Sequence, residues 1–220
     1  RDNYSISMGN PDLQPEYTDA FEITSINKIG KASLNFSLYN RHTTDIIERV
    51  TTFENNISTS RPENIGENTT TGFEFNGKYA PLNWLSLNGD FNINYFDRKG
   101  LFEDTSFDFK GNRWSSSLTS QFKLPADFDI EISGDYRSKY KTVQRQVSSN
   151  LFIRKKILKG KTILNISIRD VFASRVDESI TTQPEFYLFN SRKRGRFVTF
   201  GISYGFGKGE AMEFSGQRRR

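Results

Sequence analysis

The chain has 220 residues, of which 35% are hydrophobic, 26% are charged and none is cysteine, and its formal net charge is +5. Its mean hydropathy is -0.65, and no stretch comes near the ~20 apolar residues that a spanning helix needs, which excludes a helical membrane protein. A membrane-spanning β-barrel stays open, because only the lipid-facing half of each of its strands must be apolar. The absence of cysteine excludes a disulfide framework and a thiolate metal site.

The first recognisable element is the sequence Asn-Pro-Asp-Leu-Gln-Pro-Glu at residues 10–16. Each proline ring fixes its own φ and pushes the residue before it out of the helical region. An alternating stretch begins directly afterwards, at Tyr17. The segment therefore predicts a rigid, extended lead-in to a β-strand.

Alternation of apolar and polar residues with a period of two dominates the rest of the chain and predicts strands with two unlike faces. Within residues 85–95, Leu85, Leu87 and Phe91 share one face, whereas Asn88 and Asp90 share the other. About nine such strands and no amphipathic helix are expected. In chain order the strands cover residues 17–26, 32–39, 73–79, 85–95, 113–123, 129–136, 149–157, 164–169 and 198–206.

The connections between these strands alternate in length. Short ones fall near residues 28–31, 81–83, 125–127 and 159–160, and long ones near residues 41–68, 97–111, 137–146 and 171–195. Short turns at one end and long loops at the other are typical of outer-membrane barrels, whose short turns face the periplasm. At residues 125–127, a three-residue turn would place Leu124 opposite Phe128 on the apolar face and Lys123 opposite Asp129 on the polar face.

Two fold classes give this alternation: a soluble antiparallel sheet with one face on a core, and a transmembrane barrel. Rows of Asn, Ser and charge suit a hydrated lumen, and strands of about ten residues suit a tilted membrane crossing. Aromatic residues that suit interfacial girdles lie near the turns and loops: Tyr79, Trp84, Tyr95, Phe96 and Tyr136. We therefore predict an all-β fold, an antiparallel transmembrane β-barrel segment of about nine up-and-down strands from a larger barrel of ~22 strands.

Four segments resemble those of TonB-dependent outer-membrane receptors. Residues 10–16 match their Asn-Pro-x-Leu-x-Pro-Glu segment, residues 164–172 their strand ending in Asp/Asn-hydrophobic-Phe, and residues 196–206 their closing strand with the pattern Gly-x-x-Tyr-x-Phe. Residues 17–22, Tyr-Thr-Asp-Ala-Phe-Glu, are similar to the Bacteroidetes-type outer-membrane β-barrel protein family among these receptors. The chain thus resembles the C-terminal β-barrel portion of such a receptor.

The resemblance implies a place in the outer membrane of a Gram-negative bacterium and energised uptake of a scarce solute, either a metal chelate or an oligosaccharide. It also implies contact with outer-membrane lipid and lipopolysaccharide, and coupling to the TonB complex through a plug domain that is not in this chain. Two alternatives are a non-transporting outer-membrane barrel that serves adhesion or assembly, and a soluble antiparallel β domain that binds carbohydrate.

Two parts of the chain are expected. Residues 1–206 would form the C-terminal part of the barrel, and residues 207–220 a polar, basic periplasmic tail. Because the chain starts at Arg1 without an apolar signal segment, we expect a C-terminal fragment or a processed chain.

No catalytic, cofactor-binding or metal-binding residues are predicted, and an enzyme is the least expected class. His42 is the only histidine and is interpreted as a solvated loop residue, so a zinc site is not expected. Asp129, Glu131 and Asp135 share one strand face. They are interpreted as lumen charges balanced by Lys123 and Arg113, and not as general acids or bases.

Basic residues are scattered along the chain, except near residues 192–196 and 218–220. This distribution favours solvated loops and a tail over a surface for nucleic acid. Four of these residues directly precede the last expected strand, and we expect them near the phosphates of lipid headgroups: Arg192, Lys193, Arg194 and Arg196.

Overall fold

The computed structural model describes residues 5–55, 57–102, 105–106, 108–139, 145–183 and 186–206, and the side chains of all of these except residues 53, 105, 179–183 and 186–188. Every regular element in the described residues is a β-strand. No helix in this part of the chain is long and apolar enough to cross a membrane. The tail predicted for residues 207–220 lies outside the described residues.

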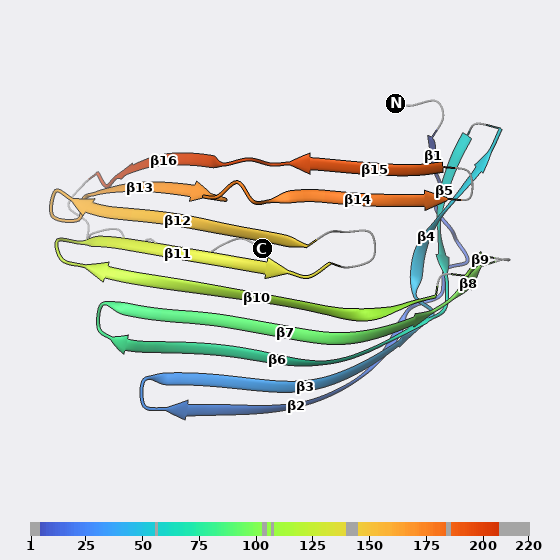
Figure 1. Ribbon diagram of the computed structural model, residues 1–220, viewed down its shortest axis with the longest axis horizontal. Helices are drawn as coiled ribbons and strands as arrows, with labels where there is room; N and C mark the ends of the chain where they lie inside the picture. The colour runs from blue at the N-terminus through green and yellow to red at the C-terminus, as the bar shows by residue number, and fades with distance from the viewer. Residues whose placement is uncertain are drawn as a thin grey trace. The chain divides into compact units, whose positions relative to one another are not determined.

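Nine strands form one antiparallel sheet, in which each strand lies beside its neighbours in chain order (Figure 1). They are β2 (Tyr17–Ile29), β3 (Ala32–Thr44), β6 (Glu67–Leu82), β7 (Leu85–Lys99), β10 (Phe109–Leu124), β11 (Phe128–Arg137), β12 (Gln146–Ile157), β13 (Thr162–Arg169) and β16 (Phe197–Tyr204). These are the nine strands that the alternation predicts, so the prediction of an all-β antiparallel fold is confirmed. Several strands extend well beyond the predicted ranges, and β6 and β10 each have 16 residues.

The chain divides into two compact units. The first contains Arg1–Ser25, Phe36–Glu74 and Asn92–Arg113, and the second contains Ile26–Asn35, Phe75–Phe91 and Trp114–Arg220. The first unit holds the Asn-Pro segment and the long connections up to residue 113. The second unit holds the four short turns and the last strands of the sheet.

Further strands lie inside three of the long connections that the sequence predicts as loops. They are β4 (Ile47–Glu54), β5 (Ile57–Asn64), β8 (Leu101–Phe102), β9 (Thr105–Ser106), β14 (Val176–Gln183) and β15 (Phe186–Lys193). Each consecutive pair is an antiparallel hairpin, and β1 (Ser5–Ser7) pairs in parallel with β5. Period-two alternation appears only where one face of a strand is apolar. Polar stretches such as Ile-Ser-Thr-Ser in β5 lack it, so their strands escape prediction.

The turn between β10 and β11 has the predicted register. Leu124 lies opposite Phe128, and Lys123 lies opposite Asp129. The backbone achieves this with φ values of 62° at Ala126 and 55° at Asp127. The two faces of the hairpin therefore stay separate from the turn to the far end of β11.

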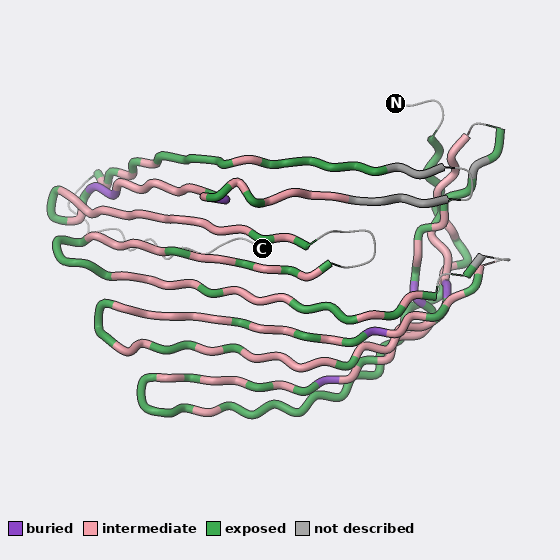
Figure 2. Tube along the Cα trace, viewed as in Figure 1, coloured by how far each residue is buried: buried purple, intermediate pink, exposed green. Residues whose placement is uncertain are grey.

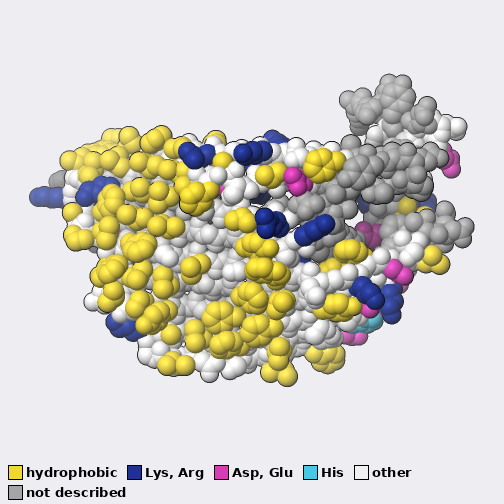
Figure 3. Space-filling model, viewed as in Figure 1, with side chains coloured by type: hydrophobic (Ala, Val, Ile, Leu, Met, Phe, Trp, Pro, Cys, Tyr) yellow, Lys and Arg dark blue, Asp and Glu magenta, His cyan; other side chains and the backbone are white. Residues whose placement is uncertain are grey.

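Apolar side chains of the sheet are exposed rather than packed in a core. Phe200 and Ile202 of β16 are 73% and 77% exposed, and Phe21 and Ile23 of β2 are 73% and 78% exposed. The buried hydrophobic residues within the described part of the chain are Tyr39, Ile46, Ile65, Phe96 and Ile163 (Figure 2). Figure 3 shows hydrophobic side chains gathered in large groups on the face in view. Soluble monomers rarely expose apolar patches this large, so this face needs an apolar environment.

Buried aromatic residues of the first unit, Tyr39 and Phe96, lie on the polar face of the sheet. Tyr39 is 7% exposed and covers Gly72, where a Cβ would overlap its ring. Phe96 is 6% exposed and lies over Gly111. The prediction that Phe96 joins Tyr95 in an interfacial girdle is therefore wrong, because consecutive strand residues point to opposite faces.

The sheet does not close into a barrel within the described residues. It ends on β2 at one edge and on β16 at the other, and almost every residue of β2 is exposed. A sheet in lipid has to close, because lipid offers no partner for the amides of an edge strand. The barrel of ~22 strands stays a prediction.

Candidate functional site

The polar face of β10, β11 and β12 in the second unit carries a ladder of cross-strand contacts. The Gln121 amide donates to Glu131 at 3.1 Å, and the Asn150 amide donates to Ser133 at 3.3 Å. The Ser148 hydroxyl donates to Asp135. These contacts join three neighbouring strands through side chains that a hydrated lumen would accommodate.

Asp129 belongs to this ladder, but its partner differs from the predicted one. Arg154 of β12 donates to one carboxylate oxygen of Asp129 from Nε at 2.9 Å and from Nη2 at 2.6 Å. Lys123 lies opposite Asp129 in register, yet the ion pair is made by Arg154. Asp129, Glu131 and Asp135 therefore each engage a polar partner on an adjacent strand, in line with lumen charges rather than an acid–base pair.

Two shallow polar depressions lie on the same face. One has a volume of about 390 Å³ and includes Gln121, Glu131 and Asn165 in its lining. The other has a volume of about 330 Å³ and includes Asn88 and Thr119. Amide, hydroxyl and charged groups contribute to both, with Phe152 and Ile163 also lining the first, so these surfaces can hydrogen-bond water or a polar solute.

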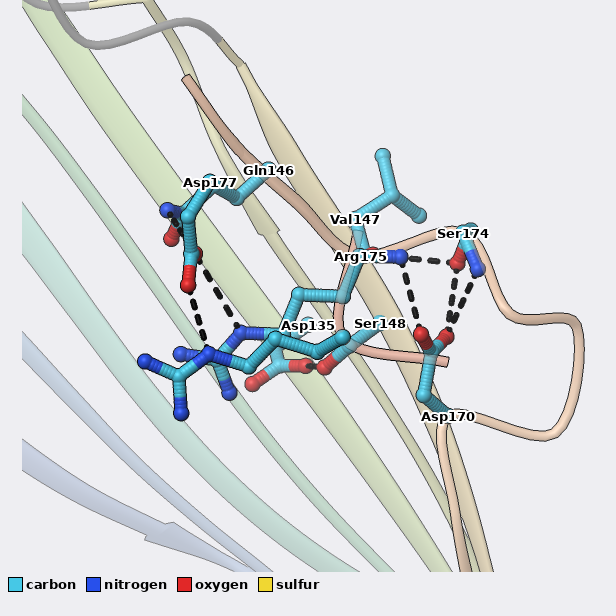
Figure 4. Close-up of polar contacts among 9 residues, drawn as sticks. Asp135, Gln146, Val147, Ser148, Asp170, Ser174, Arg175 and Asp177 are labelled. Atoms are coloured by element: carbon cyan, nitrogen blue, oxygen red, sulfur yellow. Dashed lines mark hydrogen bonds and ion pairs between the residues drawn. The ribbon is translucent and has the colours of Figure 1, made fainter. Parts of the chain in front are cut away.

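A second polar cluster lies beyond the end of β13, where the chain turns towards β14 (Figure 4). Asp170 is 4% exposed, and its carboxylate accepts hydrogen bonds from the Ser174 amide at 2.9 Å, the Ser174 hydroxyl at 3.0 Å and the Arg175 amide at 2.9 Å. Burial alone would raise the pKa of Asp170, but the backbone hydrogen bonds from Arg175 and Ser174 outweigh it and lower the pKa below its usual value. Asp170 therefore closes this turn as a carboxylate.

Asp177 of β14 collects basic and amide groups next to this turn. It accepts from Nε of Arg194 at 2.6 Å and from the Gln146 amide at 3.1 Å, and Nε of Arg175 lies 3.6 Å away. The hydrogen bond from Arg194 lowers the pKa of Asp177 more than burial raises it. This cluster ties the β14–β15 hairpin to β12.

The basic residues expected near lipid phosphates divide into two pairs. Arg194 is engaged by Asp177 at 2.6 Å, and Nε of Arg196 donates to the carbonyl of Val171 at 2.9 Å. Arg192 and Lys193 are exposed. Half of the predicted cluster thus serves the loop structure itself.

The Asn-Pro segment at residues 10–16 is fixed to the β4–β5 hairpin of the first unit. The Asn10 amide donates to the carbonyl of Pro62 at 3.0 Å and to the Glu63 carboxylate at 2.9 Å. Asn64 binds the main chain of Gln14 twice, accepting from its amide at 2.8 Å and donating to its carbonyl at 2.9 Å. The segment is therefore more than a lead-in to β2, because it also clamps a neighbouring hairpin.

Glu16 completes this clamp at the base of the hairpin. Its carboxylate accepts from the Ile47 amide at 2.6 Å, at the first residue of β4. Nearby, Ile65 is 2% exposed, the lowest value among the buried residues that the structure describes, and its amide donates to the carbonyl of Ile46 at 2.7 Å. Gly66 adopts a φ of 72°, and a Cβ there would overlap the carbonyl of Lys99. No feature of the sequence alone marks Asn64 or Gly66 for these roles.

The sequence predicts that His42 is a loop residue, but His42 lies in strand β3. Its Nδ1 is 2.9 Å from the Thr69 hydroxyl, and its Nε2 is 3.7 Å from the Glu67 carboxylate. In the described part of the chain, no group of three or more His, Asp or Glu residues is placed to hold a metal ion. His42 thus contributes to a polar strand contact.

Comparison with known proteins agrees with this architecture. The model of a family described as "Outer membrane protein beta-barrel family" matches residues 1–204. The structure of the FrpB iron transporter from Neisseria meningitidis (F3-3 variant) is similar with a TM-score of 0.59 and 17% sequence identity, over 91% of this chain and 32% of that chain. This chain therefore spans about a third of that transporter, and at this identity the likeness concerns the fold alone. No curated protein matches the chain.

Proposed function

The chain belongs to the outer membrane protein β-barrel family, which places it in the outer membrane, and from this premise we propose that it forms part of the wall of a receptor for energised solute uptake. The observation that carries the proposal is the sheet of nine antiparallel strands with an exposed apolar face and a polar face of cross-strand contacts. Such a sheet suits lipid on one side and a water-filled passage on the other.

The polar face and the structural relative each support one kind of solute. The relative is an iron transporter, which supports a metal chelate, whereas the amide- and hydroxyl-rich depressions suit an oligosaccharide equally well. We propose a scarce solute of one of these two kinds. In this proposal the chain is a passive wall and not an enzyme, and the energy comes from the TonB complex through a plug domain outside this chain.

The remaining parts of the proposal concern the surroundings of the barrel. Outer-membrane lipid would cover the apolar face, and lipopolysaccharide would meet the long connections, where Arg192 and Lys193 are exposed. A receptor of the Bacteroidetes type and a barrel of ~22 strands are the matching expectations. Residues 207–220 would then extend into the periplasm.

Deleting the gene for the full-length protein from its host tests the proposal. Growth and uptake are measured with a chelated metal as the limiting metal source, and separately with a polysaccharide as the limiting carbon source. We expect loss of one of these uptake activities, and its return when the gene is restored. A protonophore should abolish the restored uptake, because energised transport depends on the inner-membrane proton gradient.

Two outcomes contradict the proposal. Uptake that persists with the protonophore would indicate a passive pore. Unchanged uptake of every solute, together with loss of surface attachment or of another outer-membrane complex, would favour a barrel that serves adhesion or assembly.

A further inference from the structure

The four short turns of the second unit lie in one row. They are residues 30–31, 83–84, 125–127 and 158–161. A backbone hydrogen bond joins each of the first three turns, or a residue near it, to the next, and a fourth joins the last turn to the residue after β16. The pairs, amide first, are Ala80 with Lys31 at 3.2 Å, Lys123 with Trp84 at 2.8 Å, Lys156 with Asp127 at 3.0 Å, and Gly205 with Lys161 at 2.9 Å. Successive turns therefore lie on hydrogen-bonded neighbouring hairpins.

Four lysines, which we name the turn lysines, dominate the charge of this row. Lys31, Lys159 and Lys161 lie within the turns and are exposed. Lys155 lies on the apolar face opposite Phe128, with its ammonium group 5.8 Å from the centre of that ring. The only acidic residue within the turns is Asp127.

The positions of two turn lysines are fixed by the backbone. The ammonium group of Lys31 donates to the carbonyl of Pro81 at 2.9 Å, and that of Lys155 donates to the carbonyl of Ala126 at 2.6 Å. An ammonium group has three donors, so each keeps further donors for another acceptor. Within the described residues, none of the four forms an ion pair. The arginines at the opposite end of the second unit, in contrast, pair with Asp177.

Exposed apolar residues surround the turn lysines. They include Ile29 (67% exposed), Tyr79 (47%), Trp84 (46%), Leu158 (64%) and Tyr204 (46%). Trp and Tyr with an apolar body and a polar tip gather at the level of lipid headgroups. The row of turns therefore lies at the depth where a lysine meets a headgroup rather than open water.

We infer that the turn lysines bind the phosphate groups of anionic phospholipids at the short-turn end of the barrel. Charge complementarity is the physical basis: the row holds four lysines, the turns hold one carboxylate, and lysines close to an anionic lipid surface are attracted to it. Their carbonyl contacts hold two of the ammonium groups at the turns, so these cations are positioned before a lipid arrives.

The chain offers a matched control at the same end of the strands. Four other lysines lie on the polar face: Lys28, Lys78, Lys123 and Lys156. Lys78 lines the 330 Å³ depression, and Lys123 lines the 390 Å³ depression. They carry the same charge as the turn lysines but face away from the lipid. A variant of these four residues changes the net charge equally.

The test uses the full-length protein, delipidated in detergent and mixed with phosphatidylglycerol and phosphatidylethanolamine that have identical acyl chains. Retained lipid is counted by native mass spectrometry. We expect the wild type and the polar-face variant (Lys28→Gln, Lys78→Gln, Lys123→Gln, Lys156→Gln) to prefer phosphatidylglycerol. In the turn variant (Lys31→Gln, Lys155→Gln, Lys159→Gln, Lys161→Gln), the ratio of retained phosphatidylglycerol to retained phosphatidylethanolamine should be about tenfold lower than in the wild type.

Three results would overturn the inference. They are an unchanged preference in the turn variant, an equal loss in the polar-face variant, and a wild type that shows no preference for phosphatidylglycerol. Heat-modifiable migration on gels checks that each variant is folded. If the turn variant fails this check, the double variant Lys159→Gln/Lys161→Gln, which leaves both carbonyl contacts intact, takes its place, with about a threefold loss expected.

Discussion

A single carboxylate organises the connection that leaves β13. Asp170 has a φ of 51°, and Ala173, three residues later, also has a φ of 51°, so the backbone turns sharply within four residues. The carboxylate of Asp170 binds both amides that follow this turn, while the Val171 amide donates to the carbonyl of Ser149 at 2.8 Å. The aspartate of the Asp-Val-Phe segment thus has a structural explanation, whereas Phe172 is 79% exposed and takes no part in it.

Replacing Asp170 should loosen this turn. Asp170→Ala removes three accepted hydrogen bonds and leaves two amides without their partner, which costs about 1–3 kcal/mol locally. Asp170→Asn is the matched control, because its single oxygen can keep the bonds from Ser174 but not the one from the Arg175 amide. Hydrogen–deuterium exchange of the peptide that covers residues 170–178 should rise in the order wild type, Asn variant, Ala variant. Equal exchange in all three would contradict this role.

The same turn should respond to acid. The folded-state pKa values of Asp170 and Asp177 lie below the usual 3.8, so both carboxylates stabilise the folded state above that value. The stabilisation is lost as the pH falls through the lowered values, which places the transition below about pH 4. Exchange of residues 170–178, corrected for its intrinsic pH dependence, should therefore increase from pH 6 to pH 3. The Asp170→Asn variant should show a smaller change, and protection that is independent of pH would refute the assignment.

Asn64 has a comparable role at the Asn-Pro segment. Besides its two bonds to Gln14, it donates to the carbonyl of Asp45 at 2.6 Å, so one side chain joins three segments of the first unit. Asn64→Ala should cost about 1–2 kcal/mol and expose residues 10–16 to protease. Asn68→Ala is the control, because the Asn68 amide donates to Thr70 only two residues away. The prediction fails if both variants are cleaved at the same rate.

At the scale of the strand, the sequence predicts those strands that have one apolar and one polar face. All nine strands of the sheet and the register at residues 125–127 are foreseen, because apolar residues recur at every second position. The β4–β5 and β14–β15 hairpins are missed, because their sequences show no such period. The clamp around Asn64 is also missed, because hydrogen bonds between residues 50 apart leave no local signal. Phe96 is misplaced for a different reason: aromatic residues near strand ends are typical of an interfacial girdle, but strand parity puts Phe96 on the polar face.

The positive φ of Ala126 in the β10–β11 turn can be tested by substitution. Ala126 has a φ of 62°, in the left-handed region where an L-residue with a Cβ is strained by about 1 kcal/mol. Ala126→Gly should therefore stabilise the full-length protein by about 1 kcal/mol, and the β-branched Ala126→Val should destabilise it. Urea denaturation in detergent, followed by tryptophan fluorescence, measures both. A stabilising valine would show that this φ is not maintained.

At the scale of the whole molecule, the sheet needs both an apolar environment for its exposed side chains and partners for the amides of its edge strands. Large side chains are exposed on both edge strands: Phe21 and Ile23 of β2, and Phe200 and Ile202 of β16. Lipid can cover their apolar surface, but it cannot satisfy the unpaired amides along these two edges. An apolar environment alone therefore does not complete the sheet, because the amides of β2 and β16 at its edges still lack hydrogen-bond partners from another strand.

This incompleteness leads to a prediction about the 220-residue chain by itself. Refolded into lipid vesicles, it should not give a protease-resistant, heat-modifiable monomer, because β2 and β16 would leave two unpaired edges in the bilayer. The full-length protein, refolded in parallel, should give one. Cross-linking distinguishes the remaining possibilities: a closed assembly of several copies would show that strands of a second chain can complete the sheet. A stable monomer of the isolated chain would mean that β2 and β16 pair with each other, and would rule out the larger barrel.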